Sequence, residues 1–181
     1  MIFTPTPLAG AFMVELDPHR DERGFMARAF CAREFEEHGL EPATAQCNLS
    51  FNHRAGTIRG MHYQIAPATE TKFVRCVRGA VYDVIVDLRP DSPTYLHHVG
   101  VELSQENRAA LFVPAMFAHG YQTLVDDSEV LYQVSAFYAP AHERGARFDD
   151  PAFGIEWPLA PSLVSPKDLG WVPFEPQRAP Q

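Results

Sequence analysis

Four side chains able to exchange protons or carry charge fall in three strand-like runs of this sequence: His62, Lys72, Tyr132 and Tyr138. Successive side chains of a strand point to opposite faces, so the two tyrosines share one face of their run. A histidine titrates near neutral pH and can therefore move protons. If the three faces point into one barrel, these side chains meet in a mostly apolar interior, the usual form of a small-molecule site.

The elements that would position these side chains are short strands joined by turns. Sixteen prolines and eleven glycines separate the apolar runs, and long helical patterns are missing. Such spacing is typical of an all-β sandwich or barrel. Beyond the histidine run, the predicted strands cover residues 72–77, 80–88, 96–103, 110–113, 118–124 and 129–138.

Two short helices are expected beside the strands. The first covers residues 29–38 and ends at Gly39, a glycine C-cap signal. The second begins with Ser165 as N-cap, followed by Pro166 in the first turn and Asp168 in the favourable N-terminal turn.

Length and charge limit the classes of protein that this chain can represent. Its 181 residues fit one domain spanning residues 1–181, since no linker or repeat divides them. The net charge of −8 argues against a nucleic-acid partner, although a few arginines could still hold a small phosphorylated ligand. Without a signal peptide or a run of about 20 apolar residues, we expect a cytoplasmic protein that does not enter a membrane. The three cysteines form no CxxC pair and are expected to be reduced thiols.

Seven short motifs follow one another along most of the chain. The central one is the run RGMHYQ at residues 59–64, which contains His62. The others are RGF at 23–25, QCNLS at 46–50, a lysine and RCVRG within 72–79, PAMFAHG at 114–120, GIEWP at 154–158 and SPKD at 165–168. Together they resemble the motifs of the dTDP-4-dehydrorhamnose 3,5-epimerases. One such motif would be weak evidence, but seven in order are specific.

The resemblance implies a fold, an assembly and a substrate. The fold is a cupin-type jelly roll, a double-stranded β-helix with a few short helices, and the family works as a homodimer that exchanges N-terminal strands. The substrate is a nucleoside-diphosphate 4-keto-6-deoxy sugar, and no cofactor is expected. The C4 carbonyl of this sugar acidifies the protons at C3 and C5. Their removal still needs a positioned base and stabilisation of the enolate oxygen.

Four residues take catalytic roles by this resemblance. His62 is the base, and Asp168 is the carboxylate that orients it and stabilises the imidazolium. Lys72 stabilises the enolate, and Tyr132 is the general acid.

A further eight residues are implied in substrate binding. Arg59 and Arg23 hold the diphosphate through the planar guanidinium fork, with Arg23 supplied by the other subunit. The amides of Gln46 and Asn48 face the sugar or base, and Tyr138 packs against the nucleotide. The set is completed by Phe25, Arg28 and His119.

Arg28 departs from the family pattern, which usually has a glutamate near the thymine after the RGF motif. An arginine donates hydrogen bonds where a glutamate accepts them. Cytosine and guanine nucleotides therefore remain open beside thymine.

Several alternatives remain open. A single-centre 3- or 5-epimerase, or a 3,4-ketoisomerase, could use the same scaffold. A metal-dependent cupin needs converging histidine and carboxylate ligands, whereas Gln64 stands where a second histidine would be expected and Lys72 where a carboxylate would suit a metal. No metal site is therefore expected. A non-catalytic sugar-binding cupin is disfavoured because His62, Lys72 and Tyr132 are all present.

Overall fold

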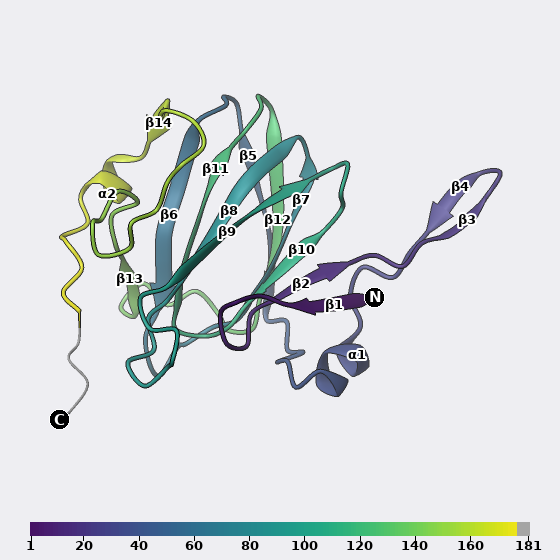
Figure 1. Ribbon diagram of the computed structural model, residues 1–181, viewed down its shortest axis with the longest axis horizontal. Coiled ribbons are helices and arrows are strands. Elements are labelled where there is room, and N and C mark those ends of the chain that lie inside the picture. Colours follow the sequence, from purple (N-terminus) through teal and green to yellow (C-terminus); the bar gives the residue numbers. More distant parts are fainter. Residues whose placement is uncertain (177–181) are drawn as a thin grey trace.

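The strands form two facing sheets, which make up the body of the protein (Figure 1). This computed structural model describes residues 1–176. The first sheet has the order β1 (Ile2–Pro5), β2 (Phe12–Glu15), β10 (Ala110–Val113), β7 (Lys72–Arg78), β12 (Ser128–Val134), β5 (Gln46–Asn52). The second has the order β13 (Glu143–Gly145), β6 (Thr57–Gln64), β11 (Phe117–Thr123), β8 (Ala80–Asp87), β9 (His98–Ser104), with β14 (Leu163–Val164) parallel to β6. The predicted all-β jelly roll is confirmed.

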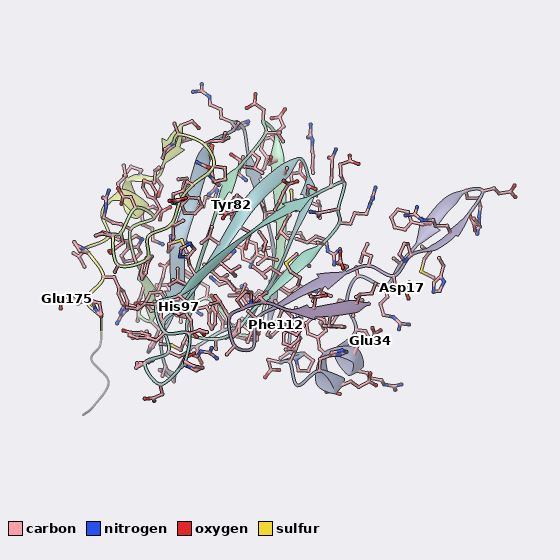
Figure 2. All side chains as sticks on the ribbon, in the orientation of Figure 1. Asp17, Glu34, Tyr82, His97, Phe112 and Glu175 are labelled. Atoms are coloured by element: carbon pink, nitrogen blue, oxygen red, sulfur yellow. The ribbon has the colours of Figure 1, made fainter. Side chains whose placement is uncertain are left out.

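The main core is a cluster of buried side chains from both sheets. Figure 2 shows side chains filling the space between the two sheets. Val74 pairs with Leu111 across β7 and β10, and both side chains are fully buried. Ile85 on β8 belongs to the same cluster. Burying one such aliphatic side chain contributes about 1.5–3 kcal/mol, so the interleaved strands are stabilised chiefly by this layer.

The first helix, α1 (Ala32–Glu37), packs on the outer face of the first sheet. Phe35 is its buried residue, and its ring meets those of Phe73 and Phe112 at centroid distances of 5.0 and 5.8 Å. The predicted end at Gly39 is confirmed by a left-handed φ of 70° there. The predicted start at residue 29 is wrong, because the helix begins at Ala32. The backbone of the preceding residue, Cys31, is still extended (φ −152°, ψ 116°).

The second helix, α2 (Pro166–Leu169), forms as predicted. Ser165 is its N-cap, and the Ser165 hydroxyl accepts a hydrogen bond from the Asp168 amide at 3.0 Å. Together with β14, this helix lies against β6 at one edge of the second sheet (Figure 1).

The strand predicted over 129–138 is too long, because β12 stops at Val134. The Ser135 amide still bonds to the Thr71 carbonyl at 3.1 Å, but the chain then turns away from the sheet. There the Gln64 side chain binds the backbone of Phe137 and Ala139 in place of a neighbouring strand. The strand predicted from residue 96 likewise begins at 98, since Leu96 has a φ of 63°.

Two glycines bring β6 and β11 unusually close together. Gly60 has a φ of 127°, and a Cβ atom there would lie 2.5 Å from the Cα of Gly120. Only glycine tolerates both the backbone angle and this approach. The pairing register of β6 and β11 shifts beside this contact. In the resulting register, His62 lies directly opposite His119.

A hairpin of β3 (His19–Asp21) and β4 (Gly24–Met26) extends away from both sheets (Figure 1). We call it the arm, residues 19–26. Every residue of the arm is exposed. On its own chain, the Phe25 ring contacts the guanidinium groups of Arg20 and Arg108 at 5.5 and 5.1 Å.

Cys31, Cys47 and Cys76 are free thiols, as predicted. Burial raises the pKa of the Cys76 thiol to about 11, which makes it unreactive at neutral pH. Within residues 1–176, no helix is long and apolar enough to cross a membrane.

Candidate active site

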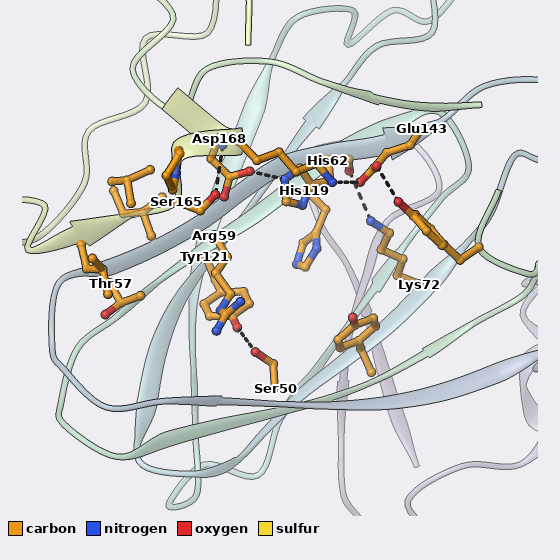
Figure 3. A pocket seen from close by; sticks show the side chains of 17 residues that line it. Ser50, Thr57, Arg59, His62, Lys72, His119, Tyr121, Glu143, Ser165 and Asp168 are labelled. Carbon is orange, nitrogen blue, oxygen red and sulfur yellow. Dashed lines mark hydrogen bonds and ion pairs between the residues drawn. The ribbon is translucent and has the colours of Figure 1, made fainter. Parts of the chain in front are cut away.

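A cleft of about 520 Å³ opens between the two sheets, beneath β14 and α2 (Figure 3). Its size is typical of small-molecule sites. Seven of the residues predicted for the site line it: Arg59, His62, Lys72, His119, Tyr132, Tyr138 and Asp168. An adjoining cavity shares His62, Lys72, Tyr132 and Tyr138 and adds the predicted Gln46 and Asn48.

His62 and Asp168 meet across the cleft, although 106 residues separate them in the sequence. The His62 Nε2 atom lies 2.6 Å from the Asp168 carboxylate, whose side chain is 4% exposed. Burial raises the pKa of Asp168, but the hydrogen bond and charge of His62 and the Gly60 amide outweigh it, so the net pKa is lowered. The ionised Asp168 accepts a hydrogen bond from Nε2–H, which leaves Nδ1 as the basic atom of the ring.

Lys72 begins β7 and points its amine into the cleft (Figure 3). The Nζ atom donates to the His62 carbonyl at 3.2 Å and lies 3.4 Å from a carboxylate oxygen of Glu70. A cationic group is thereby held beside the histidine, where it can stabilise a negative oxygen.

Tyr132 reaches the cleft from the middle of β12. Burial raises the pKa of its hydroxyl, the charge of Glu70 adds to this effect, and Arg59 opposes it. The hydroxyl therefore stays protonated at neutral pH. It forms no hydrogen bond with any residue that the structure describes, so its proton is available to a bound molecule.

A second histidine–aspartate pair lies deeper in the cleft. His119 Nε2 is 3.0 Å from both carboxylate oxygens of Asp83, and both residues are buried. The pair fixes the orientation of the His119 ring at the position facing His62.

The side of the cleft around Arg59 carries a polar network that includes residues not predicted from the sequence. Arg59 Nε donates to the Asn52 side-chain oxygen at 2.7 Å, and the Tyr121 hydroxyl lies 2.9 Å from that of Ser50 (Figure 3). Burial raises the pKa of Tyr121 despite its bonds to Ser50 and Asn52. Arg59 is itself exposed, so its guanidinium can face a bound anion.

The opposite rim is formed by three linked side chains. Glu143 accepts from the Tyr138 hydroxyl at 2.8 Å and from Lys167 Nζ at 2.5 Å (Figure 3). Burial raises the pKa of Glu143, but these two bonds outweigh it and the net pKa is lowered. The Tyr138 amide donates to Gln46 at 2.8 Å, which ties Tyr138 to β5.

Some of the residues that the prediction missed carried a signal in the sequence. Ser50 and Lys167 lie inside quoted motifs, and Glu70 shares strand parity with Lys72. Glu143 lies in a run that gave no such signal.

Three predicted binding residues lie outside the cleft in this chain. Arg23 stands on the arm, where its exposed side chain pairs with Asp21. Phe25 is also on the arm. Arg28 pairs with Glu34 at 2.9 Å, and Glu34 also binds the N-terminal amine at 2.8 Å. Those two bonds lower the pKa of Glu34 to about 2.

Within residues 1–176, no group of three or more histidine, cysteine, aspartate or glutamate side chains is arranged to hold a metal ion. The two histidines of the cleft are each committed to an aspartate of their own.

Known proteins match this chain over nearly its whole length. The profile described as dTDP-4-dehydrorhamnose 3,5-epimerase matches residues 5–175. The enzyme of that name from Sinorhizobium fredii is 42% identical over 169 residues, 93% of this chain and 87% of its own. A dTDP-4-dehydrorhamnose 3-epimerase from Streptomyces niveus is 36% identical, over 93% of this chain and 81% of its own.

Solved structures with the same fold lead to the same family. The crystal structure of dTDP-4-dehydrorhamnose 3,5-epimerase from Bacillus anthracis, with TDP and PPi bound, superposes with a TM-score of 0.92 and 37% identity. The match covers 96% of this chain and 99% of that one. With its jelly roll, its cleft and these relatives, the chain belongs to the dTDP-4-dehydrorhamnose 3,5-epimerase family of isomerases.

Proposed function

We propose that this chain epimerises C3, C5 or both in a nucleoside-diphosphate 4-keto-6-deoxy sugar, as in conversion of dTDP-4-dehydro-6-deoxyglucose to dTDP-4-dehydrorhamnose. The observation that carries the proposal is the His62–Asp168 pair, with Lys72 and Tyr132 in the same cleft. A base, a cation for the enolate and a protonated acid are the three groups that such a reaction needs.

In this mechanism, His62 Nδ1 removes the proton next to the C4 ketone. The electrons of the broken C–H bond form an enolate, whose oxygen is stabilised by the ammonium of Lys72. Asp168 stabilises the imidazolium that results. Tyr132 then returns a proton to the opposite face of the carbon, which inverts the centre. The cycle moves protons only, so it needs no electron-transferring cofactor.

Substrate binding is proposed to involve both subunits of a homodimer. Arg59 lies at the cleft and can hold the diphosphate, with Gln46, Asn48 and His119 around the sugar and Tyr138 at the nucleotide. Exchange of the arm would bring Arg23 and Phe25 into the cleft of the second subunit. Free thiols at all three cysteines suit a reducing compartment, so we propose that the single-domain enzyme is cytoplasmic.

The experiment that tests the activity is proton NMR of dTDP-4-keto-6-deoxyglucose in heavy water, with chelator-treated enzyme. Deuterium at both C3 and C5 is expected for a 3,5-epimerase. Label at C3 alone would identify a single-centre enzyme, the activity in the name of the Streptomyces niveus relative.

If no label appears, the cytidine and guanosine nucleotides are tested next, since Arg28 departs from the family pattern. A chain that labels none of these sugars but binds them would be a sugar-binding protein, and the proposed activity would be wrong.

A further inference from the structure

A carboxylate that the proposed mechanism does not use lies directly behind Lys72. Glu70 places its Oε1 atom 3.4 Å from Lys72 Nζ, and the two side chains are only 11% and 10% exposed. Glu70 also lines the cavity that adjoins the main cleft, with His62 and Tyr132. A charged pair so well shielded from water interacts more strongly than one on the surface.

Gln64 fixes the position of this carboxylate. The two N–H groups of its amide are shared among three acceptors, which are the second oxygen of Glu70 at 3.1 Å and the carbonyls of Ala68 at 3.0 Å and Phe137 at 3.3 Å. Its amide oxygen accepts from the Ala139 amide at 2.7 Å, and the residue is only 3% exposed. One oxygen of Glu70 is therefore held by a buried side chain, and the other faces the lysine.

The contacts with the His62 carbonyl and Glu70 restrict the direction of the Lys72 amine. An ammonium group has three N–H donors. One is taken by the hydrogen bond to the His62 carbonyl at 3.2 Å, and the ion pair with Glu70 at 3.4 Å draws a second toward that carboxylate. The third remains for the cleft, which Lys72 lines. Without Glu70, a flexible four-carbon side chain could turn its amine elsewhere.

We propose that Glu70, held by Gln64, is a positioning residue that aims the third N–H of Lys72 at the substrate oxygen. The inference rests on the proposed function, because it concerns the lysine that stabilises the enolate.

The first test is Glu70→Gln, which keeps the shape of the side chain and removes its charge. We expect kcat to fall about tenfold while KM changes less than about twofold, because a misdirected donor weakens transition-state stabilisation more than binding. The matched control is Glu102→Gln, which neutralises an exposed carboxylate on β9 and should leave both constants unchanged. A kcat within about twofold of wild type for Glu70→Gln would overturn the inference.

A double-mutant cycle separates positioning from a merely structural role. If Glu70 acts through Lys72, adding Glu70→Gln to Lys72→Met should cause no further loss of kcat. A second loss of about tenfold in that background would show an independent effect and overturn the inference. Should Glu70→Gln fail to fold, as judged by circular dichroism, the cycle is repeated with Glu70→Asp, which draws the carboxylate back by one methylene.

A third measurement does not depend on the reaction. In ¹⁵N-labelled protein, a shielded lysine ammonium held by a hydrogen bond and an ion pair should exchange slowly with water and give a resolved signal, which Lys72→Met identifies. The signal should be lost in Glu70→Gln and kept in Glu102→Gln. Its survival in Glu70→Gln would overturn the inference. If it is lost but wild-type enzyme labels no nucleotide sugar, the proposed function fails and the positioning of Lys72 stands.

Discussion

At the scale of single residues, the cleft gives the proposed base and the proposed acid different surroundings. His62 donates a hydrogen bond to the Asp168 carboxylate, which leaves Nδ1 free to accept a proton, whereas Tyr132 is desolvated and forms no hydrogen bond with the described residues. The two groups therefore have opposite tendencies, to gain and to donate a proton, which suits removal on one face and return on the other.

Replacing the base should stop proton exchange. His62→Asn removes the basic nitrogen but keeps a polar side chain of similar reach, so we expect deuterium incorporation to fall by about 10³-fold. Binding of dTDP, measured by calorimetry, should stay within about threefold and serves as the control for folding. Exchange near the wild-type rate would remove His62 from this role.

Tyr132→Phe should affect the return of the proton more than its removal. The variant loses the hydroxyl but keeps the ring. In heavy water, the variant should therefore still remove the substrate proton. Product with the inverted centre should form at least about tenfold more slowly than with wild type. Loss of both steps to the same extent would contradict the assignment of Tyr132 as the acid.

Because the pKa of Asp168 is lowered in the folded protein, the stability of the fold should depend on pH in the acid range. Such a carboxylate stabilises the fold fully above its unfolded-state pKa of about 3.9, and this contribution is lost as pH falls through the lower folded-state pKa. The melting temperature of Asp168→Asn should therefore fall less steeply below about pH 4 than that of wild type. Asp91→Asn, at an exposed position, is the control and should follow wild type.

At the scale of elements, the close contact of β6 with β11 decides where His62 stands. Gly60→Ala would add both left-handed backbone strain and a clash with Gly120. We expect a loss of about 2–5 kcal/mol in unfolding free energy, measured by urea titration. Gly154→Ala is the matched control, because the φ of Gly154 is also positive, at 61°, but nothing lies within 4 Å of the added Cβ. It should cost only about 1–2 kcal/mol. Equal losses would mean that the contact does not constrain the strands.

The elements also show how far the sequence could predict the site. Strand parity permitted a common interior for His62, Lys72 and Tyr132, which all line the cleft, and the N-cap signal located α2 with Asp168. The end of β12 was missed, because it depends on Gln64 replacing a strand as hydrogen-bonding partner. Glu143 was missed for a related reason, since its contacts with Tyr138 and Lys167 form only after distant segments have packed.

At the scale of the whole molecule, the arm is the element that extends away from both sheets, with all of its residues exposed (Figure 1). It carries Arg23 and Phe25, two residues expected to bind substrate, yet both lie outside the cleft of their own chain. In a two-fold dimer, exchange of arms would supply both clefts equally.

Subunit mixing tests this arrangement. Arg23→Ala should raise KM about tenfold by removing a phosphate contact, and His62→Asn should be inactive. If the arm acts on the other subunit, co-refolding equal amounts of the two variants should give about a quarter of wild-type clefts, because half the dimers then contain one intact site. Low activity that never exceeds that of Arg23→Ala alone would place Arg23 in its own cleft or outside the reaction.

The long span between His62 and Asp168 has a consequence for biosynthesis. In a chain made from its N-terminus, β6 and β7 precede the strands they pair with, and the orienting carboxylate is added 106 residues after the histidine. Contacts between such distant residues form late and slowly during folding. The cleft, which residues 163–168 themselves line, is therefore complete only after that segment has been made, so a shorter nascent chain lacks both the finished cavity and the carboxylate beside its proposed base.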